Sequence, residues 1–197
     1  MKILRYLLVG TLTLGLIPAM WGFSYFAFSV NPVHNPGVTT ADDPVDWTGT
    51  HTNTSQPCFL AFNSVTDNNV TGAGTIATVD FDTEVFDQGN DFAADTFTAP
   101  VTGRYLFTAV VQLLGIPIGV DLSLIQITTS NRTYRGSRFD LVADFPGVIG
   151  HTITVVADMD TGDTATVTVN VDGATDVVDI EGQGTDLVTS FSGCLIS

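Results

Sequence analysis

The sequence predicts an all-β protein built as a two-sheet antiparallel jelly-roll sandwich. Short runs rich in Val, Thr, Ile and Phe recur after residue 57, and turn-forming residues separate them. Several of these runs alternate apolar and polar residues, as half-buried strands do. No window in this region combines a helical period with good helix formers. A sandwich or jelly roll of short strands therefore fits the sequence better than a helical or mixed class.

The expected strands can be placed one by one. They cover residues 58–62, 75–81, 95–100, 103–114, 121–130, 151–160, 163–172, 176–180 and 188–197. Residues 68–74 (NNVTGAG) predict a turn before the second strand, because Asn and Gly are frequent in turns. Pro100 and Gly103 predict a corner, since proline lacks a backbone donor and glycine permits a chain reversal.

Residues 1–30 differ from the rest of the chain. Lys2 and Arg5 precede residues 6–30, which carry no charge. This tract is long enough to cross a bilayer. Its basic start and the small residues Ala27 and Ser29 also resemble an export signal. A third alternative is an apolar tail packed inside an assembly, so the fate of this segment stays open.

Residues 31–56 are predicted to be a linker or stalk. Pro32, Pro36, Gly37 and Pro44 interrupt a stretch of Thr, Asn and Asp, which is typical of an extended connection. The globular domain is then expected over residues 57–197.

The predicted strands differ in the polarity of their two faces. Val167, Val169 and Val171 share one face of residues 163–172, and polar residues share the other, which indicates one buried and one solvated face. Residues 103–114 are apolar on both faces. One face can fill the sandwich core, and for the other we expect another subunit as cover.

Four segments resemble the complement C1q-like family of globular heads, which have a tumour-necrosis-factor-like jelly roll. They are PCF (57–59), FTAPVTGRYLF (97–107), GD (162–163) and SFSGCLI (190–196), in the family's order. The sequences FTAPVTGRY (97–105), TTSNRTY (128–134) and ADMDTGDTA (157–165) resemble the C1q-like domains of tailed-phage fibre, spike and decoration proteins. Cys194 departs from the family, which often has an aromatic residue there, and no collagen-like period precedes the domain.

The resemblance implies a tight homotrimer, which would supply the missing cover. We expect its interface around the strand at residues 103–114 and the C-terminal strand. The predicted interface residues are Tyr105, Leu106, Phe107, Val110, Leu113 and Leu114.

One basic patch interrupts an acidic domain. The segment NRTYRGSR holds Arg132, Tyr134, Arg135 and Arg138. Arg and Tyr are enriched in recognition surfaces, so these four are the candidate ligand-binding residues, for a host-surface glycan or protein. The alternative is that the arginines neutralise neighbouring aspartates within or between subunits.

Neither the cysteines nor the acidic loop at 158–163 forms a recognisable metal motif. Cys58 and Cys194 fit no zinc spacing, and we expect buried free thiols. A disulfide is the alternative if the two end strands pair and the protein is exported. The segment DMDTGD (158–163) lacks the rest of an EF-hand and predicts a turn. No cofactor is expected, although the C1q-like resemblance leaves calcium open at residues it does not identify.

The composition of the chain narrows the range of functions that the protein can have. Among 197 residues, 6 are Lys or Arg and 21 are Asp or Glu, for a formal charge of −15, which disfavours nucleic acid as a partner. His34, His51 and His151 lie in no catalytic motif, so no enzyme is expected.

We therefore expect a trimeric structural and adhesive module on a virion surface, as a phage fibre, spike or capsid decoration. It would contact other virion proteins and contribute to host attachment. The alternative is a cell-surface or secreted ligand-binding protein with residues 57–197 outside, anchored through residues 6–30. A capsid cement without a ligand is a third possibility.

Overall fold

The computed structural model describes residues 55–140, 147–173, 175 and 177–197. The chain divides into two compact units, Met1–Thr50 and His51–Ser197, and the described residues belong to the second. The predicted apolar segment (1–30) and nearly all of the predicted linker (31–56) lie outside the described residues. Within the described part of the chain, no helix is long and apolar enough to cross a membrane.

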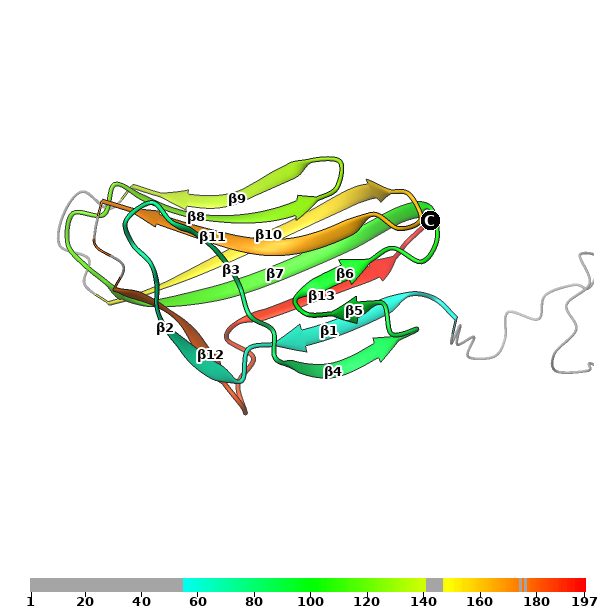
Figure 1. Ribbon diagram of the computed structural model, residues 1–197, viewed down its shortest axis with the longest axis horizontal. Helices are drawn as coiled ribbons and strands as arrows, with labels where there is room; N and C mark the ends of the chain where they lie inside the picture. The colour runs from blue at the N-terminus through cyan, green and yellow to red at the C-terminus, as the bar shows by residue number, and fades with distance from the viewer. Residues whose placement is uncertain (1–54, 141–146, 174, 176) are drawn as a thin grey trace, which may run out of the picture. The chain divides into compact units, whose positions relative to one another are not determined.

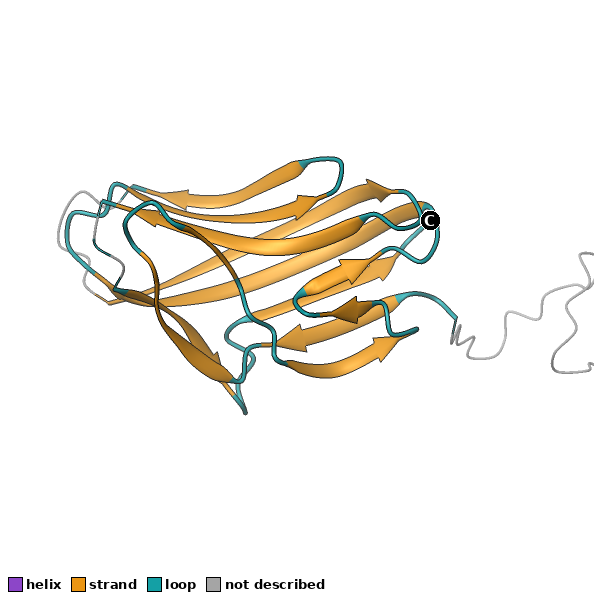
Figure 2. Ribbon diagram, in the orientation of Figure 1, coloured by secondary structure: helices purple, strands orange, loops and turns teal. Residues whose placement is uncertain are grey.

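All regular structure in the described residues is β-strand (Figure 2), which confirms the predicted class. The strands are β1 Cys58–Phe62, β2 Val65–Thr71, β3 Ile76–Thr78, β4 Thr83–Gln88, β5 Phe92–Ala93, β6 Thr96–Thr98, β7 Gly103–Ile116, β8 Leu122–Thr129, β9 Thr133–Phe139, β10 Gly147–Met159, β11 Thr164–Asp172, β12 Val178–Gln183 and β13 Ser190–Leu195.

The strands form two antiparallel sheets that pack as a sandwich (Figure 1). The seven-stranded sheet has the order β2-β12-β7-β13-β1-β4, and β10 pairs with β7. The six-stranded sheet has the order β5-β6-β11-β8-β9, and β3 pairs with β11. The first and last strands, β1 and β13, are direct neighbours. This is the two-sheet jelly roll that the sequence predicts.

The core lies between the sheets and is rich in aromatic rings. The ring centroid of Phe59 lies 4.7 Å from that of Phe92, 5.0 Å from Phe97 and 5.0 Å from Phe191. All four side chains are buried. Full burial of a side chain of this size contributes roughly 1.5–3 kcal/mol, so this cluster holds β1, β5, β6 and β13 together.

The corner between β6 and β7 carries the chain from one sheet to the other. Phe97, in the middle of β6, faces the core, and Tyr105 begins the buried face of β7 with its ring centroid 5.3 Å away. The Tyr105 hydroxyl donates a hydrogen bond of 2.7 Å to the Val101 carbonyl. The structure thus confirms the predicted corner at Pro100 and Gly103.

Two sequence predictions about strands need correction. The turn expected at residues 68–74 begins too early, because β2 continues to Thr71 and only Gly72–Gly74 turn. Asn69 has a φ of 59°, a left-handed value that Asn tolerates within this irregular strand. Strands β2, β4, β5 and β9 were not predicted.

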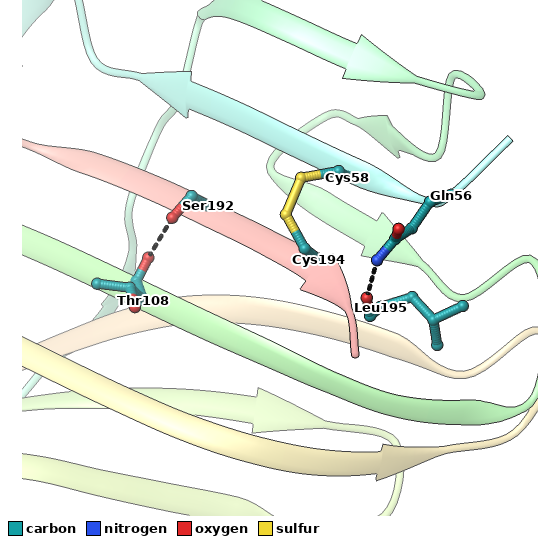
Figure 3. The surroundings of a disulfide bond; sticks show 6 residues. All are labelled: Gln56, Cys58, Thr108, Ser192, Cys194 and Leu195. Atoms are coloured by element: carbon teal, nitrogen blue, oxygen red, sulfur yellow. Dashed lines mark hydrogen bonds between the residues drawn. A yellow bond between two sulfur atoms is a disulfide. The ribbon is translucent and has the colours of Figure 1, made fainter. Parts of the chain in front are cut away.

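The expectation of free thiols is wrong. Cys58 and Cys194 form a disulfide with a Cα–Cα distance of 4.1 Å (Figure 3). The physical reason is the strand register, in which β1 and β13 pair antiparallel with these two residues directly opposite each other. Beside the disulfide, the Gln56 amide donates to the Leu195 carbonyl. The disulfide therefore joins the first strand of the domain to the last.

Candidate functional surfaces

Apolar side chains gather on the outer side of the seven-stranded sheet. We call Leu60, Phe86, Leu106, Val110 and Val156 the apolar outer face. The register places them in neighbouring rows, with Leu106 opposite Val156 on one side and Cys194 on the other. Leu60 of β1 lies opposite Phe86 of β4. The face therefore has members on four strands, which are β1, β4, β7 and β10.

Much of the apolar outer face is exposed in a single chain. Val156 is 50% exposed, Phe86 43% and Leu106 40%. Between these residues lie small hydroxyl side chains, such as Thr108 and Thr154, whose oxygens are 3.1 Å apart. Burying such a surface stabilises an assembly by about 25 cal/mol per Å² of apolar area. The face is thus suited to cover by another protein surface.

Three of the residues predicted for a trimer interface lie elsewhere. Tyr105, Phe107 and Leu113 are 0% exposed and belong to the core of their own chain. The reason is strand alternation: odd-numbered residues of β7 face the core, so Leu113 cannot share a face with Leu106. Of the predicted six, Leu106, Val110 and Leu114 remain on the outer side, and their role in an interface stays a prediction.

The predicted basic patch lies on β9, an edge strand of the six-stranded sheet. Arg135 lies opposite Gln126 of β8, and Arg138 lies opposite Leu124. Two residues of β9, Gly136 and Ser137, therefore stand against a single residue of β8, which is a β-bulge. Because of this bulge, Arg135 and Arg138 both point to the outer side of the sheet.

Tyr134 does not belong to this basic surface. It lies opposite the buried Ile127 and packs against the core. Arg132 is exposed in the β8–β9 turn, where its carbonyl accepts a 2.8 Å hydrogen bond from the Thr129 amide. The three arginines are exposed as predicted, but the tyrosine between them is half-buried and packs against the core.

Neutralisation by aspartates applies to one arginine. The Arg138 guanidinium lies 3.1 Å from the Asp140 carboxylate, and both side chains are 58% exposed. An exposed pair of this kind contributes at most about 1 kcal/mol. Among the described residues, Arg132 and Arg135 form no ion pair. The basic edge is therefore largely available to a ligand.

The turn predicted at 158–163 lies between β10 and β11 but begins later, because Asp158 and Met159 still belong to β10. The Asp163 carboxylate accepts hydrogen bonds from the Asp160 amide at 2.8 Å and the Asn131 side chain at 2.6 Å. Gly162 has a φ of 91°, which glycine adopts without strain. Asp163 thus ties this turn to the β8–β9 turn.

A second group of carboxylates lies around β3 and β4. Burial, and then the neighbouring charges of Asp95 and Asp67, raise the pKa of Asp80 above its ordinary value. Burial likewise raises the pKa of Asp67, although the Asn63 amide donates to its carboxylate at 2.7 Å. Within the part of the chain that is described, no group of three or more His, Cys, Asp or Glu side chains is arranged to hold a metal ion.

His151 was not recognised from the sequence as a special residue. Its Nε2 lies 2.6 Å from the Ser123 hydroxyl and its Nδ1 lies 2.8 Å from the Ser137 hydroxyl. Burial lowers the pKa of His151 to about 4. Although serine beside histidine is typical of a nucleophile and base, both Ser123 and His151 are 0% exposed, so this arrangement connects the sheets.

An open cavity of about 600 Å³ lies where the domain's first and last residues meet. Its walls include Pro57, Val101 and Ile196. Asp91 is the one acidic side chain in the lining, and burial, with a smaller contribution from Asp87, raises its pKa. The lining contains no His, Cys or Lys.

Comparisons with known proteins give matches among solved structures alone. No family model matches the chain, and no curated protein matches it. The globular domain of zebrafish complement 1qA protein is 18% identical with a TM-score of 0.48, and the match covers 72% of this chain and 98% of that one. Murine APRIL at pH 8.5 is 15% identical with a TM-score of 0.47, covering 72% and 99%. Murine APRIL at pH 5.0 is 14% identical with a TM-score of 0.49, again covering 72% and 99%.

Proposed function

We propose that residues 57–197 are a non-enzymatic structural and adhesion module that works as a homotrimer. The observation that carries this proposal is the apolar outer face. Leu106 and Val156 lie opposite each other and are both substantially exposed in one chain. Soluble domains rarely leave such a surface uncovered. In a closed cyclic assembly of identical chains, each chain covers the apolar outer face of a neighbour, so no chain keeps this face exposed.

The resemblance of the sequence to C1q-like heads supports three copies in preference to two. Association of three copies through the seven-stranded sheet would leave the outer side of the six-stranded sheet for ligands. Three weak sites held together bind a multivalent surface much more tightly than one site does. The module thus gains its adhesive strength from assembly.

We place the module on a virion surface, as part of a phage fibre, spike or capsid decoration that contributes to host attachment. The similarity of its motifs to phage C1q-like domains supports this placement. The Cys58–Cys194 disulfide also supports it, because disulfides persist on virion surfaces and outside cells. Other virion proteins would then be its structural partners.

A second candidate is a secreted or membrane-anchored cell-surface protein with the same domain. The uncharged tract at residues 6–30 favours it, and the disulfide suits this location equally well. Mass spectrometry of the native N-terminus separates the two candidates. Purified virions that contain the chain with Met1 intact support the virion proposal, whereas a secreted chain cleaved near Ser29 contradicts it.

The arginines of β9 and its preceding turn are the proposed recognition residues. A variant with Arg132→Ala, Arg135→Ala and Arg138→Ala should lose binding to host surfaces while it keeps its oligomeric mass. The oligomeric mass is the control, because a loss of assembly would by itself weaken binding to a multivalent surface. Unchanged binding by the triple variant would assign these arginines a structural role instead.

A further inference from the structure

Threonines form an ordered array on the outer side of the six-stranded sheet, and we call this array the threonine face. Its members lie in three cross-strand rows, Thr98–Thr164, Thr96–Thr166–Thr128–Thr133 and Thr78–Thr168. Neighbours in a row are about 4.8 Å apart, and rows repeat about every 6.7 Å along the strands. Five strands therefore present hydroxyl groups on a regular grid.

Most of these hydroxyl groups are available to a ligand. All eight threonines are exposed or half-buried. Thr96 donates to the Ala94 carbonyl at 3.2 Å, and Thr164 lies 3.2 Å from the Ser130 hydroxyl. Among described residues, the other six side chains have no hydrogen-bond partner in the protein. Each free hydroxyl can both donate and accept a hydrogen bond.

The charge of this face differs from that of the chain. The outward residues of the three rows include no acid, although the chain has a formal charge of −15. The third row continues from Thr168 through Gln126 to Arg135. Arg138 lies next to it on the same side of β9. The rows are therefore neutral, and the β9 edge carries the Arg135 guanidinium beside the Arg138–Asp140 pair.

We propose that the threonine face, with Arg135 and Arg138 at its edge, binds a carboxylated polysaccharide. This inference rests on the proposed adhesive function and names the chemical class of its ligand. A guanidinium group pairs with a carboxylate through two parallel hydrogen bonds. The sugar hydroxyls match the free threonine hydroxyls, because both kinds of group donate as well as accept. One face thus recognises both features of the polymer.

The face suits a polysaccharide better than a protein. The centre of a protein interface is rich in aromatic and apolar anchors. On the outer side of this sheet, in the described residues, Ile76 is the one strongly exposed large apolar residue, and it lies beyond the threonine rows opposite Asn170. Leu124 points to the same side but is only 6% exposed.

Binding of the full chain to immobilised polymers tests the inference. Alginate supplies carboxylates and hydroxyls, dextran supplies hydroxyls alone, and polyglutamate supplies carboxylates alone. The expected result is binding to alginate and to neither of the other two. Arg135→Ala should weaken alginate binding about tenfold, as expected for the loss of charged hydrogen bonds, with an unchanged oligomeric mass.

The hydroxyl contribution needs its own variant. The double change Thr166→Val and Thr168→Val keeps the side-chain shape and strand preference but removes two hydroxyls. It should weaken alginate binding about fivefold with an unchanged oligomeric mass. Unchanged affinity in this variant, or polyglutamate binding as tight as alginate binding, would overturn the inference in favour of charge recognition alone.

The failure of this inference can be distinguished from the failure of the proposed function. If the chain binds host surfaces through its arginines but does not bind alginate, the ligand class is wrong and the adhesive function stands. If it binds neither, both are contradicted.

Discussion

His151 and Ser123 connect the two sheets through a hydrogen bond of 2.6 Å. His151 belongs to β10 of the seven-stranded sheet, and Ser123 belongs to β8 of the six-stranded sheet. A second bond to Ser137 of β9 occupies the other ring nitrogen. The Phe139 ring lies 5.2 Å from the imidazole, measured between centroids. The imidazole is thus fully engaged and shielded from water.

This burial predicts that acid destabilises the domain through His151. The pKa falls from an ordinary 6.5 to about 4 in the folded chain. Between these two pH values the unfolded chain binds a proton that the folded chain does not, so the free energy of unfolding decreases as the pH falls. The loss is at most about 3 kcal/mol.

Urea unfolding at pH 7 and pH 4.5 measures this effect, with His151→Gln as the variant that does not titrate. Asp67, Asp80 and Asp91 have raised pKa values in the folded chain, so they act in the opposite direction and add stability as the pH falls through those values. They are present in both proteins, and the difference isolates His151. An identical pH dependence in both proteins would contradict the prediction.

Removal of the disulfide should lower the stability of the domain. Cys58 and Cys194 are separated by 136 residues in sequence, and their bond restricts a long loop of the unfolded chain. The double variant Cys58→Ser and Cys194→Ser should lose about 2–5 kcal/mol of unfolding free energy. Denaturant titration measures the loss. Reductant should destabilise the original chain and leave the variant unchanged, and equal stability of the two proteins would show that the disulfide contributes nothing.

Gly193 should tolerate no side chain. A Cβ at this position would lie 2.4 Å from the Phe107 ring and 2.7 Å from the Phe59 ring. Gly193→Ala must therefore displace core rings, at a cost of about 1–3 kcal/mol. Gly150→Ala is the matched control, because a Cβ there meets nothing within 4 Å. A thermal melt in which both variants unfold at the same temperature would refute the packing argument.

A charge on the apolar outer face should break the assembly without unfolding the chain. Val156 is 50% exposed, so Val156→Asp is compatible with a folded monomer. In an assembly, the same carboxylate would be buried without a partner, which costs several kcal/mol. Val65→Asp is the control, because Val65 is 67% exposed on the edge strand β2. Sedimentation velocity should show a smaller particle for Val156→Asp alone, and equal particle sizes for both variants would argue against this face.

The central strands could be predicted from the sequence because they are buried and alternate regularly. In β11, Val167, Val169 and Val171 are all 0% exposed, as the alternation predicts. The four strands that were not predicted, β2, β4, β5 and β9, stand at the ends of the two sheet orders. Strand β5 has only two residues, and the other three edge strands carry polar or charged residues that hide the strand pattern.

The candidate surfaces were predictable only in part. The basic segment was evident from its arginines, but the bulge at Gly136 and Ser137, which sets the direction of Arg135 and Arg138, depends on pairing with β8. The threonine rows come from five strands, so no local pattern could reveal them. The role of His151 likewise depends on hydrogen bonds to residues of the other sheet, which the sequence alone does not show.

Sedimentation equilibrium of residues 57–197 tests the central claim most directly, which is that copies of this domain cover the apolar outer face. This part of the chain lacks residues 1–56, so no segment before the domain can supply the cover. The account predicts a mass three times that of one chain, unchanged over a wide range of protein concentration. A stable monomer with its apolar outer face in solvent would contradict the account.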